Sequence, residues 1–215
     1  SGLPKFKFKP KNHIELAQSL ELIDFERGAK VAGYRGYYLK NAGAILAMAL
    51  MMYALEKMVK KGYGPMIPPT LIKGFALFGS GYFKGLDYNS EVDEIYEIVS
   101  SGKETNGVPT KDKKFLVGTA EPSLLGYYSG EILKEEDLPI RLCGFSQCYR
   151  SEIGSYGKDT KGLYRVHEFM KVEQVVISKA NIIESDKLQQ EMIEITKEIH
   201  KELGLPYRVL QICTG

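Results

Sequence analysis

The chain has 215 residues, of which 44% are hydrophobic and 26% are charged, a composition typical of a globular domain with one sizeable core. Its 29 basic and 27 acidic residues leave a net charge of +2, so bulk charge does not indicate a nucleic-acid partner. We expect no secretory leader, and the uncharged apolar run at residues 42–55 is too short to span a bilayer, which predicts a cytoplasmic protein without membrane contact.

The N-terminal part is predicted to be extended and then helical. Every second residue of the run 5–11 is lysine, which could contact a phosphate backbone, although a solvated terminus is the favoured interpretation. Asn12, with a glutamate three residues later, is typical of a capping box and predicts a helix through residue 20. A second helix is expected over residues 24–31 and a short strand over residues 37–39.

The longest helical pattern covers residues 41–61 and carries a broad apolar stripe. Gly62 ends it, and the proline-rich stretch 64–69 is predicted to be an edge strand, because proline cannot serve a central ladder. Core packing is the commoner use of such a stripe. A subunit interface formed by residues 42–69 is the alternative.

Loops that cover a site are expected over residues 74–114, which are rich in Gly, Lys, Asp and Ser and contain one strand-like piece at 95–99. A buried strand is predicted at 115–117. The turn at 118–122 follows it and opens a helix over residues 122–133.

A central hairpin is predicted from two strands, at residues 138–150 and 163–178. A long amphipathic helix over 181–203 and a last strand over 205–212 follow it. Mostly antiparallel strands flanked by helices predict an α+β domain with a mixed sheet.

The second hairpin strand has one polar and one apolar face, because strand side chains alternate. Its odd-numbered positions are Arg165, His167, Phe169, Lys171 and Glu173; its even-numbered positions include Val166, Met170, Val172 and Val176. From pattern alone, a solvated edge hairpin is the commoner explanation. Arg150 and Glu152 side by side at the end of the first strand, and a phenyl group among charges, favour a site for a charged, aromatic, phosphorylated ligand.

The three cysteines, Cys143, Cys148 and Cys213, form no CxxC motif. The first two have opposite parity on one predicted strand, which opposes both a disulfide and a shared metal site. We therefore expect reduced, partly buried thiols and assign no metal ligands.

Several motifs, in this order, resemble class II aminoacyl-tRNA synthetases and specifically the seryl-tRNA synthetase family. They are KPKNHIEL at 9–16, IDFER at 23–27, the motif 1-like segment 42–69, TAE at 119–121, the motif 2-like segment 150–173 with the loop GSYGKDT at 154–160, LPYRV at 205–209 and CTG at 213–215. Departures from the family pattern are Gly36, Ala47, Tyr149 and Glu168, which stand where Phe, Glu, Phe and Gln are usual.

The resemblance implies attack of the serine carboxylate on the α-phosphate of ATP, giving seryl-adenylate and pyrophosphate, with ATP and Mg²⁺ as cofactors. Arg150 takes the catalytic role at the α-phosphate. The implied ATP contacts are Arg150, Ser151, Glu152, Arg165, Val166 and Phe169, with Val166 acting through its backbone; the implied serine contacts are Thr119, Ala120, Glu121, Arg150 and Glu173. For Glu121, stabilisation of a helix N-terminus is the alternative, and His167 is as readily a structural histidine as a phosphate contact.

The resemblance also implies an incomplete class II catalytic domain over residues 1–215, without motif 3 and without the N-terminal tRNA-binding hairpin. The expected partners are L-serine, serine tRNA and a second copy through residues 42–69, with selenocysteine tRNA left open as another acceptor. Two alternatives stay open: a related enzyme that charges a carrier protein, and a non-catalytic binding module.

Overall fold

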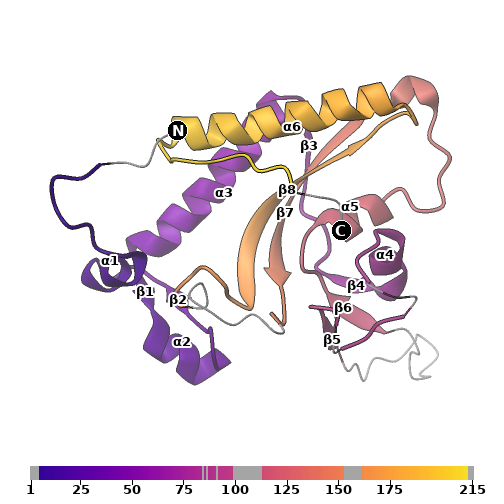
Figure 1. Cartoon of the computed structure of the whole chain (residues 1–215). Helices are drawn as coiled ribbons and strands as arrows, with labels where there is room; N and C mark the ends of the chain where they lie inside the picture. The colour runs from indigo at the N-terminus through magenta and orange to yellow at the C-terminus, as the bar shows by residue number, and fades with distance from the viewer. Residues whose placement is uncertain are drawn as a thin grey trace.

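The computed structural model describes residues 5–83, 85, 87–90, 92–98, 113–152 and 161–212. Its elements form two small sheets and a peripheral strand pair, with helices around them (Figure 1). The predicted α+β class with mostly antiparallel strands is confirmed.

The N-terminal elements are α1 (His13–Ser19), β1 (Ile23–Asp24), α2 (Phe25–Ala32) and β2 (Tyr38–Leu39). The predicted capping box is confirmed, since Glu15 N donates to Asn12 Oδ1 and Asn12 N donates to Glu15 Oε2, both at 2.9 Å. Asp24 caps α2 through its side chain, and the antiparallel β1–β2 pair holds this segment together.

The central sheet has the order β3–β7–β8, with β3 (Gly64–Met66), β7 (Ile140–Tyr149) and β8 (Glu168–Ile177). β7 and β8 pair antiparallel over ten positions, and β3 lies parallel to β7 at one edge, as the prolines predicted. Helices α3 (Ala42–Lys60) and α6 (Ile182–Glu202) lie on one side of the hairpin, and α5 (Glu121–Gly126) lies on the other (Figure 1).

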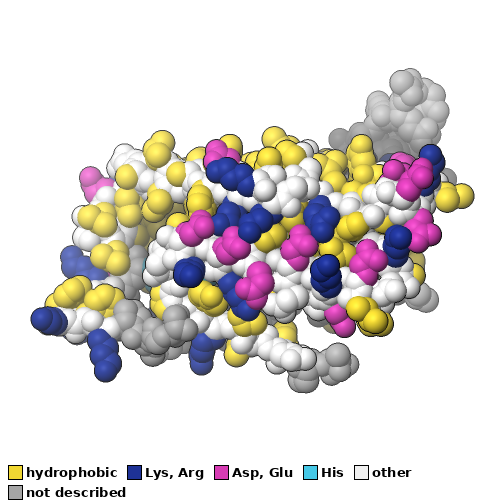
Figure 2. Space-filling view, turned by 90° about the horizontal axis from the view of Figure 1, so that it is seen from above, with side chains coloured by type: hydrophobic (Ala, Val, Ile, Leu, Met, Phe, Trp, Pro, Cys, Tyr) yellow, Lys and Arg dark blue, Asp and Glu magenta, His cyan; other side chains and the backbone are white. Residues whose placement is uncertain are grey.

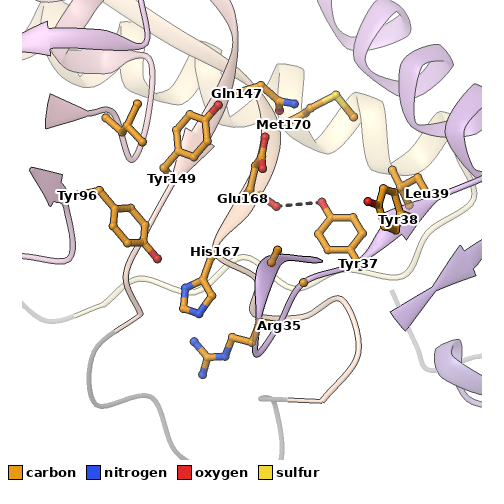
Figure 3. Close-up of a pocket in the computed structure, with 13 residues that line it drawn as sticks. Arg35, Tyr37, Tyr38, Leu39, Tyr96, Gln147, Tyr149, His167, Glu168 and Met170 are labelled. Atoms are coloured by element: carbon orange, nitrogen blue, oxygen red, sulfur yellow. Dashed lines mark hydrogen bonds between the residues drawn. The ribbon is translucent and has the colours of Figure 1, made fainter. Parts of the chain in front are cut away.

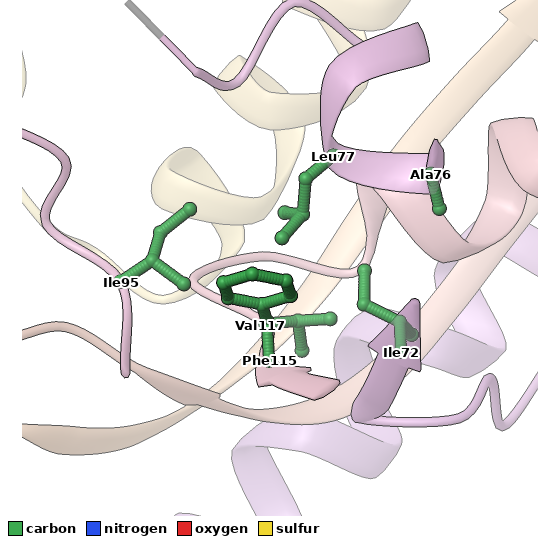
Figure 4. Packing of buried hydrophobic residues seen from close by; sticks show 6 residues of the cluster. All are labelled: Ile72, Ala76, Leu77, Ile95, Phe115 and Val117. Atoms are coloured by element: carbon green, nitrogen blue, oxygen red, sulfur yellow. The ribbon is translucent and has the colours of Figure 1, made fainter. Parts of the chain in front are cut away.

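The second sheet has the order β4–β6–β5, with β4 (Leu71–Lys73), β6 (Lys114–Leu116) and β5 (Tyr96–Ile98). Helix α4 (Gly74–Gly79) packs on it around Phe115, Leu77 and Val117, which are almost completely buried (Figure 4). The expectation of loops from residue 74 onward was therefore wrong for α4. Helix α4 has six residues and a glycine at each end. It is too short to show the apolar periodicity by which a helix is predicted from sequence.

Helices α3 and α6 are joined by ion pairs above a shared core. Lys57 Nζ lies 2.5 Å from Glu202 Oε1 and 3.0 Å from Glu198 Oε2. Beneath them Met58 and Ile195 pack with the buried Cys143. The outer surface over α6 mixes acidic, basic and apolar side chains without a large area of one sign (Figure 2).

The sequence predicts no membrane span, because the uncharged apolar run covers only residues 42–55. Helix α3 is longer than this run and extends to Lys60. By length and composition alone its 19 residues could cross a bilayer, and 11% of its apolar window is buried. Ile45 and Leu46 are among its exposed side chains. Helix α3 thus presents an apolar surface that the other described residues do not cover.

The larger differences from the prediction concern three segments. Helix α5 ends at Gly126 rather than at residue 133, because a turn through Gly130, in the left-handed region, follows it. β8 begins at Glu168, so residues 163–167 are not strand. Residues 205–212 form no strand: they fold back on α6, where Tyr207 meets His200 at 5.4 Å between ring centres. A short 3₁₀ turn, Glu135–Asp137, precedes β7.

Cys143 and Cys148 are free thiols and are fully buried on opposite faces of β7. The expectation of reduced thiols on opposite faces is confirmed for this pair, although their burial is complete rather than partial. Cys213 lies outside the described residues.

Candidate functional site

The odd-numbered face of β8 carries Phe169, Lys171 and Glu173 in a row. Their partners on β7 are Cys148, Ser146 and Gly144, all small residues. Large polar and aromatic side chains on one strand therefore lie beside small, buried residues on the next.

Arg150 follows β7 directly and is held from several sides. Its backbone N–H donates to the carbonyl oxygen of His167 at 2.9 Å, and its Nε donates to the carbonyl oxygen of Gly118 at 3.2 Å. The guanidinium carbon lies 5.5 Å from the centre of the Phe169 ring, in cation–π range. These contacts orient a cation at the end of the hairpin.

Gly118 leaves space for the Tyr82 side chain beside Arg150. A Cβ atom there would lie 2.3 Å from the hydroxyl oxygen of Tyr82 and 3.5 Å from Arg150 Cγ. Burial raises the pKa of Tyr82, and the nearby Arg150 partly opposes that rise. Tyr82 thus packs at Arg150 as a neutral phenol, a contact that the sequence did not predict.

A cavity of about 620 Å³ opens beside Arg150 and Phe169. Its lining residues are Arg150, Glu152, Leu163, Tyr164, Arg165, Val166 and Phe169. Within it, Arg165 Nη1 lies 2.6 Å from Glu152 Oε2, and the Glu152 side chain is 5% exposed. A buried carboxylate of this kind requires such a partner.

Five of the six residues predicted to contact ATP line this one cavity: Arg150, Glu152, Arg165, Val166 and Phe169. Ser151 is adjacent, with a buried hydroxyl oxygen that has no hydrogen-bond partner. The prediction that Val166 lies on the opposite face was wrong, because strand alternation begins only at Glu168.

His167 lies away from this cavity. Its Nδ1 is 2.9 Å from the carbonyl oxygen of Arg150, and its ring meets the edge of Tyr96. It lines a separate cavity of about 450 Å³ with Arg35, Tyr37 and Tyr149, on the opposite face of the hairpin from Phe169 (Figure 3). The structural interpretation of His167 is therefore the better one, since it fixes the backbone of Arg150.

The predicted amino-acid pocket continues the same row of side chains. Thr119 Oγ1 donates to Glu173 Oε2, and Lys171 Nζ lies 2.5 Å from the same oxygen. Glu121 is the first residue of α5, so its predicted alternative role at a helix N-terminus also fits its position. Part of Glu121 is exposed, but partial burial of its carboxyl group and the negative charge of Glu173 raise its pKa. The positive charge of Lys171 partly opposes this rise in pKa.

The floor of this pocket is tightly packed. Ala120 and Leu124 are fully buried. A Cβ atom on Gly144 would lie 3.0 Å from Leu124 Cδ1 and 3.2 Å from the Ala120 Cβ. Ala120, Leu124 and Gly144 thus form a tightly packed base beside Thr119 and Glu173.

Two of the motifs that carry the family resemblance lie outside the described residues: the loop 154–160 and the CTG segment at 213–215. Among the residues that the structure describes, no group of three His, Cys, Asp or Glu side chains could hold a metal ion.

A family model for the tRNA synthetase class II core domain (G, H, P, S and T) matches residues 104–215, which is more than half of the chain. This chain belongs to that family of class II aminoacyl-tRNA synthetase core domains.

Within the class, the chain is similar to seryl enzymes along nearly its whole length. The serine–tRNA ligase of Treponema denticola is 43% identical over 213 residues, 99% of this chain and 46% of that protein. Seryl-tRNA synthetase from Pyrococcus horikoshii complexed with ATP superposes with a TM-score of 0.79 at 38% identity, covering 92% of this chain and 40% of that one.

Cytoplasmic serine–tRNA ligase from Naegleria fowleri in complex with AMP gives a TM-score of 0.83 at 31% identity, covering 97% of this chain and 46% of that one. The predicted resemblance to seryl-tRNA synthetases and the class II fold are confirmed. The chain spans just under half the length of the curated relatives that it matches.

Proposed function

We propose that this chain is part of the catalytic domain of a serine–tRNA ligase, which activates L-serine with ATP and transfers it to serine tRNA. The observation that carries the proposal is one continuous row on the odd face of β8. It joins the Arg150–Phe169 cavity to the Thr119–Glu173 pocket. Adenylation needs the two substrates end to end in this way.

The phosphate role falls to Arg150. Attack of the serine carboxylate on the α-phosphate builds negative charge on the phosphate oxygens, and a guanidinium already in place stabilises it. The contacts of Arg150 with Gly118 and Phe169 support this role, because they hold the cation before substrate arrives. The same guanidinium can pair with the serine carboxylate.

The nucleotide would lie in the cavity of about 620 Å³. Phe169 stacks on adenine, and the carboxylate of Glu152 accepts from the adenine amino group. Arg165 holds Glu152 at 2.6 Å and has 47% of its side chain exposed, so it can also reach a phosphate. Ser151 and Val166 complete the contacts as neighbours of these groups.

The serine ammonium and hydroxyl would be bound by Glu121, Glu173 and Thr119, above the buried Ala120. A pocket that pairs the substrate hydroxyl rejects alanine, because its own polar groups would be left unpaired.

We infer that Mg²⁺ enters with the ATP phosphates. The described residues offer no cluster of ligands for it, and Mg²⁺ often binds through substrate phosphates with few protein ligands.

The exposed apolar side of α3 supports a homodimer formed through residues 42–69. Covering that surface with a second copy also fits a cytoplasmic protein that does not contact a membrane. Selenocysteine tRNA would be a second acceptor if its acceptor end is bound in the same way.

The test is serine-dependent ATP–pyrophosphate exchange. We expect a higher rate of exchange with serine than with threonine, alanine or glycine. It also expects Arg150→Ala to lower exchange by at least about 10²-fold with the fold intact. Arg27→Ala, which changes an arginine that is 77% exposed in an ion pair with Asp24, is the matched control and should leave exchange unchanged. If Arg150→Ala keeps its exchange activity, Arg150 does not stabilise the α-phosphate as proposed.

A further inference from the structure

Helix α1 reaches the wall of the nucleotide cavity through one side chain. His13, its first residue, belongs to the KPKNHIEL motif, to which the proposed chemistry gives no role. The Nε2 atom of His13 accepts a hydrogen bond from the backbone N–H of Leu163 at 3.3 Å, and its ring lies 4.3 Å from the Tyr164 ring between ring centres. Both Leu163 and Tyr164 line the cavity of about 620 Å³ beside Arg150.

The turn before Leu163 is shaped to receive this imidazole. Gly162 has a φ angle of +72°, in the left-handed region that favours glycine. A Cβ atom at Gly162 would collide with His13 Nε2, so the imidazole occupies the space that a side chain would fill. Three consecutive residues, 162–164, therefore lie against one histidine that is distant from them in the sequence.

The segment 161–167 needs such a contact, because it comes before the paired part of β8. The ladder between β7 and β8 begins at the pair Tyr149–Glu168. A part-buried backbone N–H group outside a ladder requires another acceptor, and His13 supplies one to Leu163. His13 is itself held in place, because the capping box fixes the first turn of α1.

We propose that His13 is a positioning residue for nucleotide binding, which holds Leu163 and Tyr164 as one wall of the cavity before ATP arrives. The inference rests on the proposed function. A wall that is already ordered does not have to be ordered on binding, so the free-energy cost of association is smaller. Nε2 can accept a hydrogen bond only in the neutral imidazole that carries its hydrogen on Nδ1, so the role requires this tautomer.

The test compares His13→Leu and His13→Gln with the parent chain. Leucine has no acceptor, whereas the side-chain carbonyl of glutamine can accept from the Leu163 N–H in place of Nε2, and both residues suit a helix. His200→Leu is the matched control, because His200 also lies on a helix against a tyrosine, Tyr207, but outside the cavity lining.

Three quantities are measured on each protein. Calorimetric titration gives the affinity for ATP and for AMP, and thermal unfolding gives the melting temperature. NMR without nucleotide gives the exchange rate of the Leu163 amide hydrogen, which depends on how often its hydrogen bond opens. In the parent, long-range ¹⁵N–¹H correlations of the His13 ring also show which nitrogen carries the hydrogen.

We expect His13→Leu to bind ATP and AMP about 2- to 10-fold more weakly than the parent, the effect of losing one hydrogen bond. The Leu163 amide should exchange faster in this variant. His13→Gln should recover most of the affinity and most of the protection from exchange, and His200→Leu should match the parent in both. The parent should carry the His13 hydrogen on Nδ1.

If the parent binds nucleotide and His13→Leu binds it equally well, the positioning role is overturned; a lower melting temperature with that result assigns His13 to stability alone. An equal loss of affinity in His13→Leu and His13→Gln also overturns the role, because the acceptor would then not matter. If the parent itself binds neither ATP nor AMP, the proposed function fails, and the inference about His13 fails with it.

Discussion

Replacement of Phe169 by leucine isolates the stacking surface of the nucleotide cavity. Phe169 lines the cavity and lies under the Arg150 guanidinium, 5.5 Å from ring centre to carbon. Leucine keeps an apolar side chain on β8 but removes the aromatic face. The change therefore tests stacking without opening a large hole in the sheet.

The expected loss follows from these contacts. Stacking of a base on an aromatic ring contributes roughly 1–3 kcal/mol, which is about a 5- to 150-fold weaker affinity for ATP or AMP. The substitution also removes the cation–π contact between Phe169 and Arg150, which contributes about 0.5–1 kcal/mol to the free energy of unfolding at a partly open site. The free energy of unfolding should fall by about 1 kcal/mol, a change of about 2–4 °C in melting temperature.

The assay is calorimetric titration with AMP and ATP, with thermal unfolding measured on the same samples. Phe75→Leu is the matched control: Phe75 lies on α4, 57% exposed and outside the cavity lining. Its nucleotide affinity should equal that of the parent. The reasoning is refuted if Phe169→Leu binds nucleotide as tightly as the parent, or if both variants lose affinity equally.

The remaining predictions address the core, a pH effect, the subunit interface and a thiol. Phe115→Ala removes a ring that is 2% exposed and in contact with Phe83 and Tyr88, so chemical denaturation should show a loss of about 3–5 kcal/mol; a loss under about 1 kcal/mol would contradict the packing. The pKa of Glu121 is raised above its ordinary 4.5, so the contribution of Glu121 to stability falls as pH rises from 4.5 through the raised pKa. Glu121→Gln should therefore be more stable relative to the parent near neutral pH than at about pH 4. An equal effect of the substitution at both pH values would contradict the upward direction of the pKa shift. Leu46→Glu, at a side chain that is 65% exposed on α3, should shift the mass measured by light scattering from dimer to monomer, whereas an unchanged mass would exclude this interface. Burial raises the pKa of Cys143 to about 11, so this thiol should resist a disulfide reagent in the native protein and react on unfolding; rapid native labelling would contradict its burial.

Local signals predicted the local structure well. Asn12 and Glu15 form the capping box that their spacing indicated, because such a cap depends on residues three apart. The shared face of Phe169 and Glu173 follows from strand alternation alone. For the same reason the row of site residues on β8 could be found in the sequence.

Contacts between distant residues could not be predicted in this way. Arg150 is oriented by Gly118 and packed near Tyr82, and nothing near Arg150 in the sequence signals either partner. Lys171 was placed on the right face, but its ion pair with Glu173 became visible only in the structure. The segment 205–212 alternates like a strand, yet a strand also needs a ladder partner, and this segment packs on α6 instead.

We propose that one face of β8 binds a seryl group and an adenylate together. This is tested most directly by equilibrium binding of the non-reactive seryl-adenylate mimic 5′-O-(N-L-seryl-sulfamoyl)adenosine beside its alanyl and threonyl counterparts, which share the adenylate half. We expect the seryl compound to bind more tightly than both, because Thr119, Glu121 and Glu173 would pair its hydroxyl and ammonium, and a pocket fitted to serine would exclude the extra methyl group of threonine. Equal binding of the three compounds, or no binding of any, would contradict it.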